Sequence, residues 1–244
     1  MSGHLNIVST PIGNLQDITF RAIEVLKSVD LILAEDTRVA KKLLNHYAIK
    51  NKITSFNLIN ENQKTDTLIK QLKEGENIAL IVDAGTPLIS DPGYFLIRCA
   101  REESIQVIPV PGCSAAIAAL TSSGISSDRF TFYGFLPKTK VKKIKELIKF
   151  TNRPETLIFY ESVHRIVNTI ECMKEIFGES RNAVLCKEIT KLHESFIGNN
   201  LLEISTYLSK NPDRLKGEFT IVVQGKKNTS IDYEKIDFIL SLLT

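Results

Sequence analysis

The chain has few residues of the kinds that hold metals or form disulfide frameworks. Its 244 residues include four cysteines and four histidines, and no two cysteines form a C-x-x-C pair. No cysteine stands at zinc-ligand spacing from a histidine either. The sequence therefore predicts no metal site. The cysteines are expected to be reduced, mostly buried thiols of a cytosolic protein.

Long apolar runs are also missing. No segment approaches the roughly 20 apolar residues that a membrane-spanning helix needs. The first four residues lead directly into a strand-like run and do not form a secretory signal. We therefore expect a cytoplasmic protein. Hydrophobic residues make up 43% of the chain and charged residues 24%, which is ordinary for a globular protein with a sizeable core.

The sequence contains no internal repeat and no low-complexity tract, so the order of short apolar runs is the guide to the fold. In the first half, strand-like runs alternate with helical patterns, and this alternation predicts parallel β-α-β units with right-handed crossovers. Asp17 is expected to cap the first helix and Gly75 to end the third. The predicted strands are 5–9, 31–34, 52–56, 78–82 and 107–110, and the later helices are 37–47, 65–74 and 94–103.

The proline-rich segment 109–112 interrupts this alternation, and a second half begins near Gly124. We predict an N-terminal α/β domain over 1–113, with a Rossmann-like parallel sheet, and a C-terminal α/β domain over 114–244. The predicted strands of the second half are 130–134, 156–160, 183–187 and 218–224. Its predicted helices are 114–122, a lysine-rich helix after residue 134, 164–176 and 233–243.

In a parallel sheet, ligands bind beyond the carboxyl ends of the strands. The loop 83–93 follows the clearest buried strand and opens a helix. Its glycines let a ligand approach the backbone closely and its prolines stiffen it, so it suits a nucleoside or an amino-acid carboxylate. A long turn with helix capping is the alternative. We favour a ligand site because the special residues extend over the whole loop.

Four further segments give weaker evidence for a functional site. The loop 10–14 lies where a dinucleotide loop would but lacks G-x-G-x-x-G, which disfavours a nicotinamide cofactor. The segment 35–38 places three charged groups after a buried strand, although Asp36 also suits an N-cap. Asn60 and Glu61 could face the same crevice or simply cap a helix. The segment 187–191 could face an interdomain cleft or form a solvated loop.

A run of lysines follows residue 137. With the single opposing charge of Glu146, its six lysines carry +5 in a chain of net charge +3, so the rest of the chain sums to −2. Such a concentration is expected where a protein contacts a phosphate backbone, although a solvated helix face is the common alternative. The aromatic residues beside it are expected mostly to pack in the core. They are Phe130, Phe132, Tyr133 and Phe135.

Six segments together resemble one family over nearly the whole chain and in the same order. They are 8–19, 34–38, 83–93, 159–165, 187–191 and 216–220. The family is that of ribosomal RNA small subunit methyltransferase I, within the tetrapyrrole-methylase superfamily. The resemblance implies two α/β domains with S-adenosylmethionine in the cleft between them, and a homodimer. It also implies methylation of the 2′-hydroxyl of a cytidine in the decoding region of 16S ribosomal RNA, with the 30S subunit as the expected partner.

The resemblance also implies the residues that contact the cofactor. They are Ile12, Asp83, Gly85, Thr86, Pro87, Ile89, Ser114, Ala115 and Tyr160. Two departures stand out. The family often has histidines where this chain has Asn57 and Ile59, so a mechanism that depends on those histidines would fail here. The family usually has proline where Cys113 stands, which is expected to loosen the turn without changing the chemistry.

A ribose hydroxyl is a poor nucleophile, so a base or a polarising cation should assist it. The carboxylate candidates are Glu35, Asp36, Glu61 and Glu188. Arg38, Lys187 and Lys191 could bind phosphate or lower the pKa of the hydroxyl, and the sequence does not rank any of these residues. The predicted RNA contacts are Lys138, Lys140, Lys142 and Lys143. Two other functions stay open at this point. One is methylation of a small tetrapyrrole by the same fold, and the other is a non-catalytic RNA-binding assembly factor.

Overall fold

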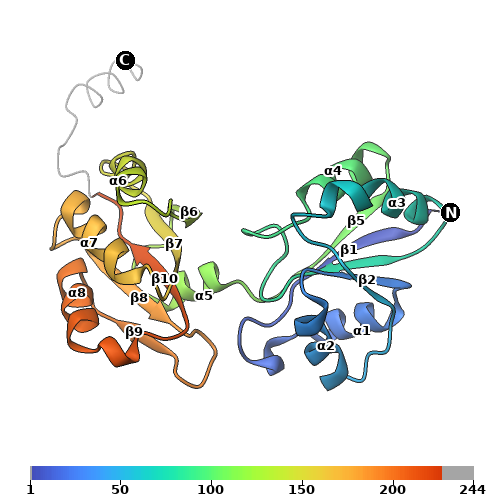
Figure 1. Cartoon of the computed structure of the whole chain (residues 1–244), viewed down its shortest axis with the longest axis horizontal. Coiled ribbons are helices and arrows are strands. Elements are labelled where there is room, and N and C mark those ends of the chain that lie inside the picture. Colours follow the sequence, from blue (N-terminus) through green and yellow to red (C-terminus); the bar gives the residue numbers. More distant parts are fainter. Residues whose placement is uncertain (1, 227–244) are drawn as a thin grey trace, which may run out of the picture.

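The computed structural model describes residues 2–226 and contains two five-stranded sheets, one in each lobe of the molecule (Figure 1). The first sheet is wholly parallel, with strand order β3-β2-β4-β1-β5. This confirms the predicted parallel β-α-β units. Its strands are β1 (His4–Val8), β2 (Leu31–Ala34), β3 (Ile53–Ser55), β4 (Ile78–Ile81) and β5 (Gln106–Val110).

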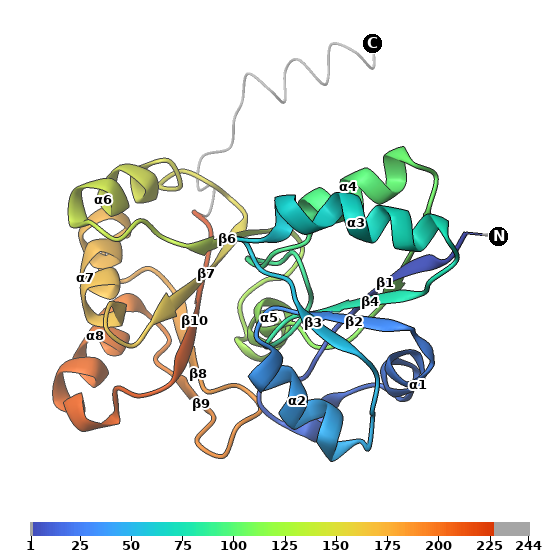
Figure 2. The same cartoon turned by 45° about the vertical axis from the view of Figure 1, so that its right-hand side comes forward.

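Helices cover both faces of the first sheet, with α1 and α2 on one side and α3 and α4 on the other (Figure 2). Because both faces are covered, β2 and β4 are buried at every position. Each face has its own apolar core, one including Leu26 and Leu44 and the other Leu72 and Leu96. The helices are α1 (Phe20–Ser28), α2 (Thr37–His46), α3 (Glu61–Lys73) and α4 (Tyr94–Glu102).

The second sheet is mixed, with strand order β6-β7-β10-β8-β9. β6 runs parallel to β7, whereas β10 is antiparallel to both β7 and β8. Three helices pack on one face and α5 (Ala115–Ser122) on the other. The remaining elements are β6 (Phe130–Phe135), α6 (Lys140–Ile148), β7 (Thr156–Ser162), α7 (Ile166–Phe177), β8 (Ala183–Lys187), β9 (Ser195–Ile197), α8 (Leu201–Lys210) and β10 (Glu218–Val223).

Two sheets match the predicted two-part α/β organisation, while the boundary at residue 113 stays a prediction. Ile12 comes from the loop after β1 but is buried in the core between α5 and the second sheet. Asn14 N–H also donates to Thr190 Oγ1 at 3.2 Å. The loops after β1 and β8 therefore hold the two lobes against each other at one end of the space between them.

Several sequence-based boundaries need correction. Asp17 does not cap α1. It ends a short 3₁₀ turn, and the cap is Thr19, whose Oγ1 accepts from Ala22 N–H at 3.1 Å. α3 begins four residues before the predicted start at Thr65, and α7 begins at Ile166, two residues after the predicted one. Gly75 follows α3 with φ +104, as expected of a glycine that ends a helix.

Two elements were missed, namely β9 and α8. The predicted helix 233–243 lies outside the described residues. Cys172 and Cys186 are buried, as expected, whereas Cys99 and Cys113 are only half-buried. In the stretch 2–226, no helix is both long enough and apolar enough to span a bilayer.

Candidate active site

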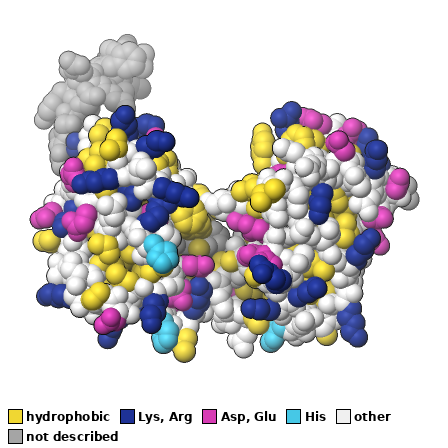
Figure 3. Space-filling model, viewed as in Figure 1, with side chains coloured by type: hydrophobic (Ala, Val, Ile, Leu, Met, Phe, Trp, Pro, Cys, Tyr) yellow, Lys and Arg dark blue, Asp and Glu magenta, His cyan; other side chains and the backbone are white. Residues whose placement is uncertain are grey.

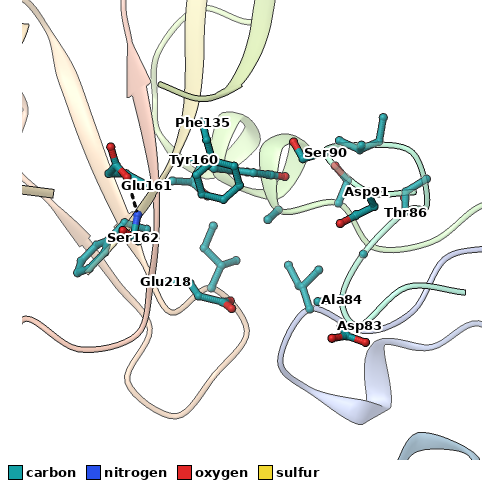
Figure 4. A pocket seen from close by; sticks show the side chains of 18 of the residues that line it. Asp83, Ala84, Thr86, Ser90, Asp91, Phe135, Tyr160, Glu161, Ser162 and Glu218 are labelled. Carbon is teal, nitrogen blue, oxygen red and sulfur yellow. Dashed lines mark hydrogen bonds between the residues drawn. The ribbon is translucent and has the colours of Figure 1, made fainter. Parts of the chain in front are cut away.

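A cleft of about 480 Å³ lies between the two lobes, and residues from both lobes line it (Figure 3, Figure 4). Its volume is in the range typical of small-molecule sites. The first lobe contributes the loops after β1, β2 and β4, which all leave the same edge of the sheet. The second contributes the ends of β6, β7 and β10. The lining residues used below are Ile12, Glu35, Asp83, Gly85, Ser90, Asp91, Phe135, Tyr160, Glu161, Glu218 and Ile189.

The loop after β4 forms one wall and is tied to its neighbours by hydrogen bonds. Thr10 and Gly85 exchange two backbone hydrogen bonds, of 2.9 and 3.1 Å. Thr86 Oγ1 donates to the carbonyl of Cys113 at 2.9 Å and lies 3.0 Å from Ser9 Oγ. The loops after β1, β4 and β5 therefore form one connected floor. Leu88 and Ser90 have φ values of +72° and +77°, a strained backbone that clusters at functional sites in proteins.

Tyr160, at the end of β7, stands on the opposite wall. Its hydroxyl oxygen accepts from Ala116 N–H at 3.1 Å, which fixes the ring against the start of α5. Burial raises the pKa of this tyrosine, so the hydroxyl stays neutral. Ile12 and Ile189 are both buried and add apolar surface to the cleft. The walls thus offer flat and branched apolar contacts beside polar groups.

The lining is strongly acidic. Among the described residues five carboxylates line the cleft and no lysine or arginine does. Burial is the main cause of a raised pKa at Glu35 and Asp83, and each is also close to other carboxylates. Burial and the charges of Glu35 and Asp83 raise the pKa of Asp91 to about 7. The site therefore favours a cation, and it favours a proton on Asp91.

Most of the predicted cofactor contacts come together here. Eight of the nine line the cleft, and only Pro87 does not. Two groups that sequence reasoning left out also line it. Asp91 lies inside the loop 83–93, and Glu218 lies inside the segment 216–220. Both segments had been singled out, but the sequence gives no sign of which of their residues face a ligand.

Of the predicted catalytic residues, Glu35 lines the cleft and the others lie outside the lining. Asp36 caps α2 and binds Arg38, with 2.6 Å between Oδ2 and Nη2, and Arg38 holds the pKa of Asp36 at about 2. The Asp36 N–H donates to Asp83 Oδ1 at 3.1 Å, so Asp36 supports a carboxylate that does line the cleft. The Arg38 side chain is 88% exposed.

Glu61, Lys187 and Glu188 serve local structure. Glu61 is buried, and its Oε1 accepts from the N–H groups of Gly93 and Phe95 at 3.2 and 2.8 Å, which fixes the end of the loop 83–93. Lys187 donates to the carbonyl of Arg214 at 2.7 Å. Glu188 accepts from Lys191 Nζ and from Glu218 N–H, both at 2.9 Å.

The fold exposes three of the four lysines predicted to contact RNA and buries the fourth. Lys138, Lys140 and Lys142 are exposed, as an RNA contact requires, and basic side chains gather over the part of the lobe that carries α6 (Figure 3). The prediction for Lys143 is wrong, because this side chain is 1% exposed. Its Nζ donates to Thr169 Oγ1 at 2.6 Å and to Asn168 Oδ1 at 3.0 Å. It belongs to a buried polar network.

Of the four aromatic residues before that run, two pack against the core and two are exposed. Phe132 and Tyr133 pack against the cores of the second lobe, as expected. Phe130 and Phe135 are 43% and 54% exposed, so the expectation of core packing does not hold for them.

Comparison with known proteins identifies the family. Residues 4–205 match the family described as Tetrapyrrole (Corrin/Porphyrin) Methylases. The chain belongs to the tetrapyrrole methylase family. A crystal structure of diphthine synthase has a similar fold, with a TM-score of 0.69 at 13% identity, over 96% of this chain and 94% of that one. Two lobes with a cleft between them are therefore the architecture of this tetrapyrrole methylase, as its sequence predicted.

Some relatives of this tetrapyrrole methylase are much closer. A Haemophilus influenzae protein named Ribosomal RNA small subunit methyltransferase I is 52% identical over 93% of this chain and 80% of its own length. A Pasteurella multocida protein of the same name is 47% identical over 95% of this chain and 83% of its own length.

The cleft of this tetrapyrrole methylase fits S-adenosylmethionine in its chemistry. The cofactor carries a sulfonium and an ammonium against one carboxylate, so its net charge is positive. Glu161 is paired with Lys143 and Arg165, and Glu218 is paired with Lys191, so the negative charge that complements the cofactor comes from Glu35, Asp83 and Asp91. The apolar surfaces of Ile12, Ile189 and Tyr160 suit an adenine ring. The charge and the apolar surfaces of the cleft therefore suit a methyl donor of this kind.

Gly13 offers a test of how the cleft is closed at one end. A Cβ at this position would lie 2.4 Å from Lys191 Cγ and 2.7 Å from Thr190 Oγ1. We expect Gly13→Ala to push the two loops apart at a cost in folding stability of about 1–3 kcal/mol, the usual cost of overpacking, and to weaken S-adenosylmethionine binding because Ile12 is displaced. Calorimetric titration measures this. Gly124→Ala is the control, because no atom lies within 4 Å of its Cβ position and the strain of an alanine at its φ of +69° falls on the turn after α5, outside the cleft lining. Equal affinities for both variants would contradict the prediction.

Proposed function

We propose that this chain transfers a methyl group from S-adenosylmethionine to the 2′-hydroxyl of a cytidine in the decoding region of 16S ribosomal RNA. The acidic cleft that gathers eight predicted cofactor contacts carries the proposal. The names of the relatives, at up to 52% identity, support ribosomal RNA as the substrate. The reaction belongs in the cytoplasm, where ribosomal subunits are present, and a homodimer stays a prediction.

When bound, S-adenosylmethionine supplies an activated methyl group, so the protein mainly has to align the reactants. The loop 83–93, Ile12 and the start of α5 would hold this cofactor, with Asp83 and Glu35 contributing negative charge. Asp91 is the best-matched base for the ribose hydroxyl, because a general base works best with a pKa near the working pH. Asp91 lies inside the cleft, whereas the exposed lysines of the segment 138–145 do not line it.

The direct test is transfer of a tritiated methyl group to 30S subunits and to naked 16S ribosomal RNA, followed by nucleoside mapping. We expect label in 2′-O-methylcytidine. Label on a base or on protein would refute the proposed reaction. Calorimetry with S-adenosylmethionine alone separates an enzyme from a non-catalytic assembly factor, since the latter does not need the cofactor.

The exposed lysines give a second test. We expect replacement of Lys138, Lys140, Lys142 and Lys145 by glutamine to weaken RNA binding and to flatten its salt dependence. Each lost phosphate contact reduces the slope of log K against log salt by roughly 0.7–0.9. Filter binding at several salt concentrations measures the slope. S-adenosylmethionine affinity should stay unchanged, because none of these lysines lines the cleft.

A matched control has four exposed lysines replaced elsewhere, at positions 27, 42, 70 and 210. It removes the same net charge from the chain. If this control flattens the salt dependence as much as the first variant does, the lysine segment is not the RNA contact.

A further inference from the structure

We propose that the ring of Phe135 is a stacking platform for an unpaired base of the RNA substrate at the mouth of the cleft. This inference rests on the proposed function, because it takes the substrate to be RNA. The side chain is 54% exposed and also lines the cleft. The ring is therefore accessible both to a ligand in the cleft and to a group outside it.

A β-bulge places Phe135 there. In a regular strand, Phe132 and Phe135 would point to opposite faces, because side chains alternate. The pairing of β6 with β7 shifts between Phe132 and Gly134, so that Phe132 lies opposite Ile158 and Gly134 opposite Phe159. The extra residue turns Phe135 to the face of Tyr160. Bulges beside active sites commonly re-aim a side chain in this way.

Tyr160 contacts both phenylalanines in edge-on geometry, with centroid distances of 4.8 Å to Phe132 and 5.7 Å to Phe135. Because the Tyr160 hydroxyl is held by Ala116 N–H, it forms a fixed backing for the Phe135 ring. Figure 4 shows Phe135 and Tyr160 together on the wall that faces Ser90 and Asp91. Phe135 can therefore offer an aromatic surface without first having to be ordered.

At Gly134 the strand that carries Phe135 comes close to the loop 83–93. Its φ is +78°, and a Cβ there would lie 3.1 Å from Ser90 Oγ. The bulge and the loop that lines the opposite wall thus come close at this point. A base stacked on Phe135 would have its ribose near the acidic interior, where Asp91 lies, while the base itself stays at the mouth.

The chain after Phe135 leads directly to the phosphate contacts. Arg165 Nη2 donates to the carbonyls of Leu136 and Pro137, which fixes the segment between the ring and Lys138. A flat apolar surface followed by exposed lysines matches an unpaired nucleotide, whose base stacks while its phosphate binds cations. S-adenosylmethionine carries no phosphate, so the exposed lysines that follow in the chain favour an RNA nucleotide over the cofactor's adenine as the partner of the ring.

The experiment compares Phe135→Ala with Phe135→Tyr, which keeps the ring. Phe130→Ala is the matched control, because Phe130 lies on the same strand, is 43% exposed and does not line the cleft. The probes are an RNA hairpin with one unpaired cytidine in its loop and the same hairpin with an abasic site there. Affinity for S-adenosylmethionine is measured in parallel.

We expect Phe135→Ala to bind the intact hairpin roughly 5- to 100-fold more weakly, the usual loss for one stacked base. It should lose little on the abasic hairpin, and Phe135→Tyr should restore binding. In methylation of 30S subunits, the loss should appear mainly in KM. Equal losses on both hairpins, a loss only in S-adenosylmethionine affinity, or an equal loss for Phe130→Ala would overturn the inference.

The inference and the proposed function fail in different ways. If the unmodified protein methylates neither 30S subunits nor naked RNA, the proposed function fails. If it methylates 30S subunits and Phe135→Ala does so with unchanged kcat and KM, only the stacking role fails.

Discussion

Replacing Glu161 with glutamine is expected to lower the free energy of unfolding by about 3–5 kcal/mol, the usual loss when one partner of a buried ion pair is removed. Glu161 and Lys143 are almost fully buried, with 4.0 Å between Oε2 and Nζ. Arg165 Nε lies 3.2 Å from Glu161 Oε1, and the Arg165 side chain as a whole is 22% exposed. Glu161→Gln would leave the cationic side chains of Lys143 and Arg165 without the carboxylate that now neutralises them.

The hydrogen bonds of Glu161 make the loss larger. Its Oε2 accepts from Thr169 Oγ1 at 2.6 Å and its Oε1 accepts from Ser162 N–H at 2.8 Å. A glutamine has only one acceptor oxygen, so its amide group would face a donor on one side. Figure 4 shows the carboxylate turned away from the loop that carries Asp83 and Asp91. The effect therefore concerns the stability of the second lobe.

Urea unfolding measures the loss, with Glu102→Gln as the control. Glu102 pairs with Arg98 on an exposed helix face, where a pair contributes at most about 1 kcal/mol. Adding Lys143→Met to Glu161→Gln should recover stability, because it removes one stranded cation. If the double variant is less stable than Glu161→Gln alone, the charge argument is wrong.

The pH dependence gives an independent check. Burial lowers the pKa of Lys143 even in the intact protein, and the charge of Glu161 opposes this. Without that charge the folded-state pKa falls further below the unfolded value. The unfolded chain then binds more protons, so stability rises with pH up to the unfolded pKa of about 10.4. The deficit of Glu161→Gln should shrink from pH 7 to about pH 9.5.

The parallel sheet could be predicted because its central strands are short, continuous apolar runs between helical patterns. The same pattern indicated only that ligands bind at the loops beyond the carboxyl ends of these strands. The individual cofactor contacts were implied by the family resemblance. α8 was missed although its start carries a signal. Asn200 Oδ1 accepts from Glu203 N–H at 2.9 Å, the pattern of an N-cap.

Other features depend on contacts between distant segments. In sequence, Lys143 is one lysine among several, and only its spacing of four from Leu147 places it on the buried face of α6. The bulge that turns Phe135 outward depends on pairing with β7, which a single strand does not reveal. Burial raises the pKa of Asp91, and so do the charges of Glu35, which comes from another loop, and of Asp83, at the start of the same loop. A catalytic carboxylate could therefore not be selected from sequence.

Replacing Asp91 with asparagine is expected to slow single-turnover methylation by roughly 10²–10⁴-fold, the range that general bases contribute. The same change should stabilise the ligand-free protein above pH 7. Burial and two neighbouring carboxylates raise the pKa of Asp91 to about 7, well above the unfolded value of about 3.9. Folding therefore favours the protonated carboxyl. This contribution to stability is fully present below about pH 4 and is lost as the pH rises to about 7. Asparagine resembles the neutral form and avoids that loss.

Thermal melting at pH 6 and pH 8 and single-turnover rates between them test both halves of the prediction. The unmodified protein should react faster as the pH rises to about 7 and then level off, because only the ionised carboxylate accepts a proton. Asp91→Asn should lack this step and melt at a higher temperature at pH 8, while Asp66→Asn, at an exposed position on α3, should change neither. A slow variant that is also less stable at pH 8 would mean that Asp91 holds the loop together. If Asp91→Asn reacts as fast as the unmodified protein, Asp91 is not the base. A lower methylation rate together with a higher melting temperature is the result expected of a carboxylate whose ionisation is needed for catalysis but lowers the stability of the fold.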